Sequence, residues 1–154
     1  MPRIFCITFL RRFVKSFETH SEEETIELGR KIARELPKRS VVLLIGNLGA
    51  GKTTLAKGII DGLGAGSPEE VASPTFTLIH EYAGGRVYHI DLYRLDTPAQ
   101  VATLGLDEIF DHILDDDAVA LIEWGEKFRE LMPADRIEIT LSADGEQNRK
   151  IAIT

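Results

Sequence analysis

Apolar residues along the chain occur as continuous runs and as spaced repeats, and the two patterns predict different elements. Residues 41–45 and 118–122 are apolar without alternation, which is typical of strands buried on both faces. Two further pairs of strand-like segments flank turns that contain glycine, as tight hairpins do. These pairs predict four more strands, over residues 75–82, 86–93, 136–141 and 149–154.

Apolar residues at helical spacing predict helices between the strands. The first begins at a possible capping box formed by Ser21 and Glu24 and stops at Pro37. The second follows the first buried strand through a glycine-rich turn and ends at Gly64. The expected helices cover residues 21–36, 52–63, 98–104 and 126–131. Because strands and helices are interleaved, we expect an α/β fold whose sheet is partly parallel, with antiparallel hairpin additions.

Composition narrows the class of protein. A chain of 154 residues suits one domain with a sizeable core. The formal net charge of -7 argues against unaided nucleic-acid binding, because phosphate backbones are held chiefly by clustered cations. The single cysteine, Cys6, excludes an internal disulfide and fits a reducing compartment. No apolar run approaches the roughly 18 residues of a membrane span.

The N-terminal segment has two interpretations. Residues 4–10 are apolar and precede Arg11 and Arg12, which raises the alternative of a signal peptide. The charges follow the apolar stretch, and no small-residue cleavage site comes next. We therefore predict that residues 1–14 form an N-terminal extension or a first strand, that residues 15–154 form a single domain, and that the protein is cytoplasmic.

The most specific signal lies between the first buried strand and the second helix, where residues 46–53 match the P-loop pattern GxxxxGK[ST]. Its glycines allow several backbone N–H groups to point into one concavity, and the following helix presents its positive end to the same phosphates. Lys52 is expected to neutralise phosphate oxygens, and the Thr53 hydroxyl to bind Mg²⁺. The guanine-reading motif [NT]KxD is absent, which favours ATP. The predicted phosphate-binding residues are Asn47, Leu48, Gly49, Ala50, Gly51, Lys52, Thr53 and Thr54.

Hydrolysis requires acidic groups near the metal as well. Glu123 ends the second buried strand, where P-loop proteins place a metal-associated acid, and capping of the strand is the alternative. Asp91 follows an alternating strand, and the alternatives are that it orients the attacking water, joins the Mg²⁺ shell or caps a turn. Thr75 lies in a segment that can supply a γ-phosphate-sensing hydroxyl in P-loop switch proteins, and a loop threonine that starts a strand is the alternative. Trp124 is interpreted as a core or interface aromatic rather than as a base-stacking one.

Several segments taken together resemble the TsaE family, a group of small P-loop ATPases in bacterial tRNA threonylcarbamoyladenosine synthesis. The matching segments are GNLGAGKTTLAKGI, SPTFTLIHEY, HIDLYRL, LGLDEIF and LIEWGEKF, with weaker similarity in the first helix and the last hairpin. The resemblance implies a P-loop NTPase-like three-layer sandwich over residues 15–154, a single P-loop ATPase domain. One departure is residues 111–117, which are longer and more acidic than the family pattern.

The resemblance also implies a pathway and partners. Family members act with TsaB, TsaC and TsaD to modify an adenosine of tRNAs that read codons beginning with A. The ATPase docks on the TsaB–TsaD pair, and ATP hydrolysis resets the complex. We therefore expect ATP and Mg²⁺ as cofactors, protein partners rather than tightly bound nucleic acid, and no membrane.

By the family pattern, Lys52, Asp91 and Glu123 are the catalytic residues, and Thr53 and Glu123 bind the metal. Glu22 matches a residue near the nucleotide base, although helix capping also explains it, and Arg149 matches a basic residue that approaches the nucleotide or is simply solvated. Two other functions remain open. One is a small-molecule P-loop kinase, although no arginine-rich lid segment is evident, and the other is a nucleotide-gated binding module with negligible turnover.

Overall fold

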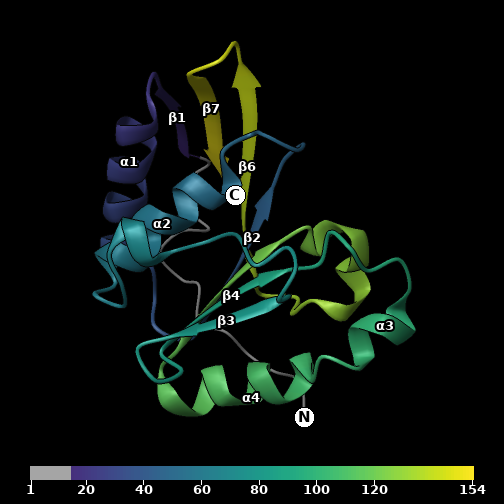
Figure 1. Ribbon diagram of the computed structural model, residues 1–154. Coiled ribbons are helices and arrows are strands. Elements are labelled where there is room, and N and C mark those ends of the chain that lie inside the picture. The colour runs from purple at the N-terminus through teal and green to yellow at the C-terminus, as the bar shows by residue number, and fades with distance from the viewer. Residues whose placement is uncertain (1–14) are drawn as a thin grey trace.

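The computed structural model describes residues 15–154, and its strands form one seven-stranded sheet in the order β1-β7-β6-β2-β5-β4-β3 (Figure 1). The strands are β1 Lys15–Thr19, β2 Ser40–Ile45, β3 Ile79–Tyr82, β4 Val87–Asp91, β5 Val119–Glu123, β6 Ile137–Asp144 and β7 Asn148–Ile153. The four inner strands β6, β2, β5 and β4 are parallel, whereas β7, β1 and β3 are antiparallel to their neighbours. The predicted mixed sheet with a parallel core is confirmed. The expectation for residues 1–14 lies outside the described residues.

Helices cover both faces of the sheet. Consecutive residues of a strand point to opposite faces, so two neighbouring residues of β4 show which helix lies on each face. On β4, the Tyr88 ring packs edge-on against His112 of α4, with ring centroids 5.8 Å apart. The next side chain, His89, points the other way and contacts Glu123, which in turn contacts Thr53 of α2. The helical segments are α1 Glu22–Glu35, α2 Lys52–Gly62, α3 Pro98–Ala102, α4 Leu106–Asp116 and the 3₁₀ segments η2 Pro68–Glu70 and η3 Gly125–Leu131.

Helices α1 and α2 lie side by side and touch through glycines (Figure 1). A Cβ atom built on Gly58 would lie only 2.0 Å from the carbonyl oxygen of Ile26, and one on Gly29 would lie 2.6 Å from that of Leu55. Both distances are shorter than any real Cβ contact, so these backbones approach as closely as glycine permits. This contact fixes α2, and with it the P-loop that precedes α2, against α1.

Gly58→Ala should therefore destabilise the protein strongly. The added methyl group meets backbone atoms that cannot rotate away, so α1 and α2 must separate, at a cost of about 1–3 kcal/mol or more for overpacking. Equilibrium urea unfolding measures the loss. Lys57→Ala, one position earlier on the same helix, is the matched control and should leave stability almost unchanged; an equally stable Gly58→Ala protein would contradict the close contact.

The elements expected from the sequence differ from the structure in three places. The segment 75–82 becomes a strand only at Ile79, because residues 75–78 form a turn in which Leu78 has a φ of 69° and donates its N–H to Pro74. Helix α4 was not predicted, although Leu106, Phe110 and Ile113 are buried on one side of it. Its C-terminal half, together with the C-cap Asp117, is the acidic stretch 111–117. Strand β1 was also missed, whereas the short helix predicted over residues 126–131 is present as the 3₁₀ segment η3.

At the start of α1, Ser21 accepts a hydrogen bond from the N–H of Glu24 over 3.1 Å, as predicted. The reciprocal bond differs from a standard capping box, since the Glu24 carboxylate accepts from the N–H of His20 rather than from that of Ser21. Over residues 15–154, no helix combines the length and apolar character that a membrane crossing requires.

Candidate functional site

The P-loop occupies the turn between β2 and α2 at the carboxyl edge of the parallel strands. Gly49 and Gly51 have φ values of 81° and 101°, in the left-handed region that favours glycine. Gly51 is the N-cap of α2, so the first N–H groups of the helix lack carbonyl partners within it and point out of its N-terminus. A cavity of about 290 Å³ lies against these groups. Free N–H groups at a helix N-terminus bind phosphate well, so this cavity has a lining that suits a phosphate chain.

Lys52 is the first residue of α2 and is buried. Its ammonium donates to the carbonyl oxygens of Gly46 and Asn47 and lies 3.8 Å from the centre of the Trp124 ring. Burial lowers the pKa of Lys52 below its ordinary value, and the negative charges of nearby acidic residues partly offset that effect. Trp124 thus has a role that the sequence did not show, because it supports the cation through its ring face.

Glu123 ends β5 and points at the start of α2. Both of its carboxylate oxygens lie 3.1 Å from the Thr53 hydroxyl, which donates to them. Two ligands at right angles in an octahedral Mg²⁺ shell, each about 2.1 Å from the ion, are separated by about 3.0 Å. The oxygen atoms of Thr53 and Glu123 therefore have a spacing and a chemistry that fit Mg²⁺, which is bound through one or two protein oxygens together with phosphate oxygens.

Asp91 ends β4 and is held at both carboxylate oxygens. Thr75 donates its hydroxyl to Oδ2 over 2.9 Å, and the N–H of Tyr93 donates to Oδ1 over 2.8 Å. Ser73 lies 2.7 Å from the Thr75 hydroxyl oxygen and continues the chain of polar groups. Because the turn over residues 75–78 replaces the start of the predicted strand, Thr75 can bend back onto β4. The carboxylate is thus fixed beside the cavity.

The two acids face each other on neighbouring strands. The register of the parallel pair places Asp91 directly opposite Glu123, and both side chains are almost fully buried. Like charges in this arrangement destabilise a sheet. A cation between the carboxylates and the phosphates would relieve the repulsion, which is a second observation that fits Mg²⁺ at this position.

Glu126 adds a third acidic group close to Lys52. Its Oε2 is buried without a hydrogen-bond partner among the described residues. Burial raises the pKa of Glu126, and the positive charges of Lys52 and Arg129 oppose the shift. Sequence reasoning did not single out this residue, because an acid in a short helix usually faces solvent.

Glu126→Gln should stabilise the nucleotide-free protein at neutral pH. The folded protein holds the Glu126 proton more tightly than the unfolded chain, so its stability falls as the pH rises from the ordinary glutamate pKa through the raised one. The variant lacks this loss, and its advantage in urea unfolding should shrink between pH 8 and pH 5. Glu130→Gln, an exposed site in the same segment, serves as the control. An advantage that does not change with pH would contradict the assignment.

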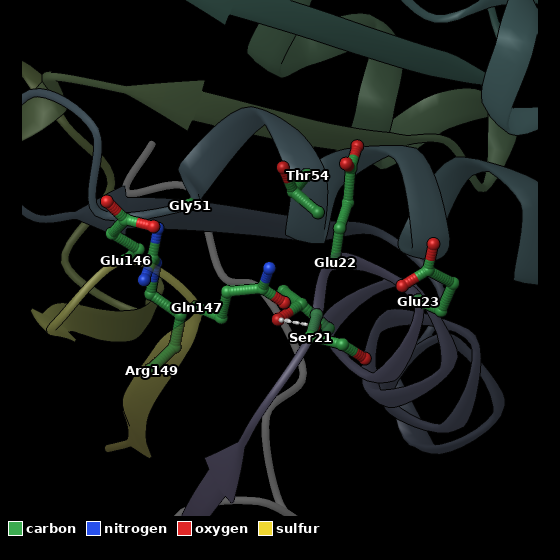
Figure 2. A pocket seen from close by; sticks show the side chains of 9 residues that line it. Ser21, Glu22, Glu23, Gly51, Thr54, Glu146, Gln147 and Arg149 are labelled. Carbon is green, nitrogen blue, oxygen red and sulfur yellow. Dashed lines mark hydrogen bonds between the residues drawn. The ribbon is translucent and has the colours of Figure 1, made fainter.

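A second hollow, of about 470 Å³, adjoins the P-loop (Figure 2). Figure 2 shows that the lining residues come from three places, namely the start of α1, the P-loop with the start of α2, and the turn between β6 and β7 with the first residues of β7. Glu22 lines this hollow and not the phosphate cavity, whereas Gly51, Thr54 and Arg149 line both. Because the two cavities share these residues, they adjoin each other at the P-loop.

Arg149 approaches the loop from β7. Its guanidinium donates to the carbonyl oxygen of Gly49 over 3.4 Å, and its Nε would lie 3.4 Å from a Cβ built on Gly51. The predicted site residues therefore meet at one edge of the sheet, although they come from distant parts of the sequence. Those that line the phosphate cavity are Leu48, Gly49, Ala50, Gly51, Lys52, Thr53, Thr54, Thr75, Asp91, Glu123 and Arg149. Asn47 contributes its carbonyl oxygen to Lys52.

Comparison with known proteins identifies the family. The family model for the threonylcarbamoyl adenosine biosynthesis protein TsaE matches residues 19–151. The tRNA threonylcarbamoyladenosine biosynthesis protein TsaE of a Nostoc species is 42% identical over 135 residues, which cover 86% of this chain and 81% of that protein. The protein of the same name from Bacillus subtilis is 38% identical over 140 residues, covering 90% of this chain and 84% of its own length.

The fold agrees with these matches. The crystal structure of Bacillus subtilis YdiB superimposes with a TM-score of 0.70 at 33% sequence identity and covers 92% of this chain and 84% of its own. The matched residues include the P-loop, both buried acids and most of the sheet. The chain therefore belongs to the TsaE family of threonylcarbamoyl adenosine biosynthesis proteins.

Proposed function

We propose that this chain is a Mg²⁺-dependent ATPase that binds the TsaB–TsaD complex and supports repeated cycles of tRNA threonylcarbamoyladenosine formation, with TsaC acting upstream. One observation supports the proposal most directly. A P-loop lysine, a hydroxyl and two buried carboxylates converge on a single cavity of about 290 Å³. Membership of the TsaE family supports a role in tRNA threonylcarbamoyladenosine biosynthesis.

Each group has a distinct task in this proposal. The backbone N–H groups at the start of α2 and the ammonium of Lys52 bind the phosphates. Thr53 and Glu123 hold Mg²⁺, which neutralises negative charge on the phosphates when it is bound. Asp91, fixed by Thr75 and by the N–H of Tyr93, orients a water molecule through its remaining lone pairs. The adjoining hollow, with Glu22 and Arg149 on its wall, accommodates the nucleoside.

The charge of the chain supports protein partners rather than direct tRNA binding. A formal net charge of -7 repels a polyanion, whereas a protein surface imposes no such penalty. In this proposal the ATPase therefore acts on tRNA only through the complex that it joins, and it works in the cytoplasm. A tight complex between tRNA and this chain alone would contradict that part of the proposal.

The test combines phosphate release with tRNA modification. We expect the purified chain to release inorganic phosphate from ATP slowly, faster with TsaB–TsaD, and only when Mg²⁺ is present. Multiple rounds of tRNA modification should require the wild-type chain and fail with Glu123→Gln. Transfer of phosphate to a small molecule instead of water would favour a kinase. Sustained modification by a hydrolysis-deficient protein would favour a nucleotide-gated binding module.

A further inference from the structure

A completely buried histidine on the neighbouring strand contacts the carboxylate of Glu123. His89 lies on β4 with 0% of its surface exposed, and its Nε2 is 2.6 Å from Oε2 of Glu123. The register pairs His89 with Leu121 and Asp91 with Glu123, so the contact crosses diagonally between strands. The other ring nitrogen, Nδ1, is buried without a hydrogen-bond partner among the described residues.

These contacts define the direction of the hydrogen bond. An ionised carboxylate has no proton to donate, so Nε2 carries the hydrogen and Glu123 accepts it. Nδ1 has no hydrogen-bond partner among the described groups, so a hydrogen there would be a buried donor without an acceptor. The geometry therefore fits the tautomer with hydrogen on Nε2.

His89 is an unfavourable choice for packing alone. The strand positions around it are filled by apolar residues such as Ile90 and Leu121, which bury no polar atom. An unsatisfied buried polar group costs about 1–3 kcal/mol, and an apolar side chain of similar size would avoid that loss. The one hydrogen bond that the ring makes within the described residues goes to Glu123, and this bond compensates for the unsatisfied atom.

We infer that His89 is a positioning residue for Glu123, an inference that rests on the proposed Mg²⁺-dependent function. The two carboxylate oxygens have different partners, since Oε2 accepts from His89 and from Thr53, whereas among the described residues Oε1 accepts only from Thr53. When the Thr53 oxygen turns to Mg²⁺, its bond to Glu123 is lost, and His89 is the donor that still fixes the carboxylate. His89 thus leaves Oε1 available to the metal or to a water bound to it.

These contacts predict that loss of the His89 donor has its main effect when Mg²⁺ is bound. Without nucleotide, Thr53 alone still holds Glu123, so loss of the His89 donor should disturb the resting structure little. With Mg²⁺, the carboxylate loses its remaining anchor. Removal of a partner that orients a metal ligand typically lowers metal affinity about 10–100-fold. We therefore expect the coupling between Mg²⁺ and nucleotide to weaken by that factor.

Substitution of His89 by glutamine and by asparagine distinguishes the hydrogen bond from Nε2 from the packing of the side chain. In His89→Gln the amide nitrogen lies the same number of bonds from the backbone as Nε2, whereas in His89→Asn it corresponds to Nδ1 and falls short of Glu123. The measurement is the affinity of each protein for ADP with Mg²⁺ and with EDTA. The ratio of the two dissociation constants is the coupling. The glutamine variant should retain most of the wild-type coupling, and the asparagine variant should lose it.

Two further measurements exclude a purely structural effect. In the Glu123→Gln background, His89→Asn should cause no additional loss of coupling, because its effect passes through that carboxylate. Nitrogen-15 NMR of the nucleotide-free wild-type protein should show hydrogen on Nε2 of His89, and this measurement needs no variant protein. A ring without hydrogen on Nε2 would overturn the inference.

The outcomes also separate this inference from the proposed function. Normal coupling in both His89 variants, or equal loss in both, would overturn the positioning role while leaving the ATPase proposal intact. A wild-type protein that binds ADP without any influence of Mg²⁺ would contradict both. Coupling that behaves as expected in a protein that never releases phosphate would support the role of His89 and contradict the ATPase.

Discussion

Lys52→Ala should abolish productive ATP binding. Lys52 is buried, its ammonium donates to the P-loop carbonyl oxygens of Gly46 and Asn47, and the residue lines the cavity in which phosphates are expected. Truncating one partner of a buried, hydrogen-bonded charge pair costs about 2–5 kcal/mol. That loss corresponds to roughly 30-fold to several thousandfold weaker binding. Titration with a fluorescent ATP analogue measures it, and phosphate release should disappear in parallel.

The control for Lys52→Ala must separate binding from folding, because the same ammonium also holds the carbonyl oxygens of Gly46 and Asn47. Lys52→Met keeps much of the apolar stem, so its contact with Trp124 should be partly preserved. If thermal unfolding of Lys52→Met matches that of the wild type and ATP binding is still lost, the charge is responsible. Normal ATPase activity in either variant would remove Lys52 from the mechanism.

Glu123→Gln should separate hydrolysis from nucleotide binding. The amide keeps the shape of the side chain but lacks the negative charge that Mg²⁺ and its bound water require. Loss of one group that stabilises charge in a transition state typically lowers kcat by about 10²–10³-fold. We expect a decrease of that size in phosphate release under saturating ATP. Affinity for ATP measured in EDTA should remain close to that of the wild type.

The same substitution should not destabilise the nucleotide-free protein. Asp91 lies directly opposite Glu123, and like charges in such pairs destabilise a sheet. Removing either charge relieves the repulsion, so Asp91→Asn is the matched counterpart in urea unfolding. The double variant should gain little beyond either single one, because both act on the same pair. A large loss of stability in Glu123→Gln would show that the carboxylate is chiefly structural.

Local patterns in the sequence were sufficient for much of the fold. The continuous apolar runs around Val42 and Leu121 predicted buried parallel strands, and these strands are neighbours at the centre of the sheet. The turn at residues 75–78 and helix α4 were missed for different reasons. The turn follows from Leu78 adopting a positive φ, which side-chain hydrophobicity does not reveal. In α4 the clustered aspartates obscured the helical spacing of its apolar residues.

The expected chemistry of the P-loop follows from one short segment, because the pattern from Gly46 to Thr53 is continuous and its glycines, lysine and hydroxyl have local roles. The way in which the other groups meet depends on how distant segments pair and pack. Residues 91 and 123 face each other because β4 and β5 are paired in one particular register, and a shift by one residue would turn either carboxylate to the opposite face. Contacts of His89 with Glu123 and of Lys52 with Trp124 depend on that pairing and on the close packing of α1 and α2, which no local pattern encodes.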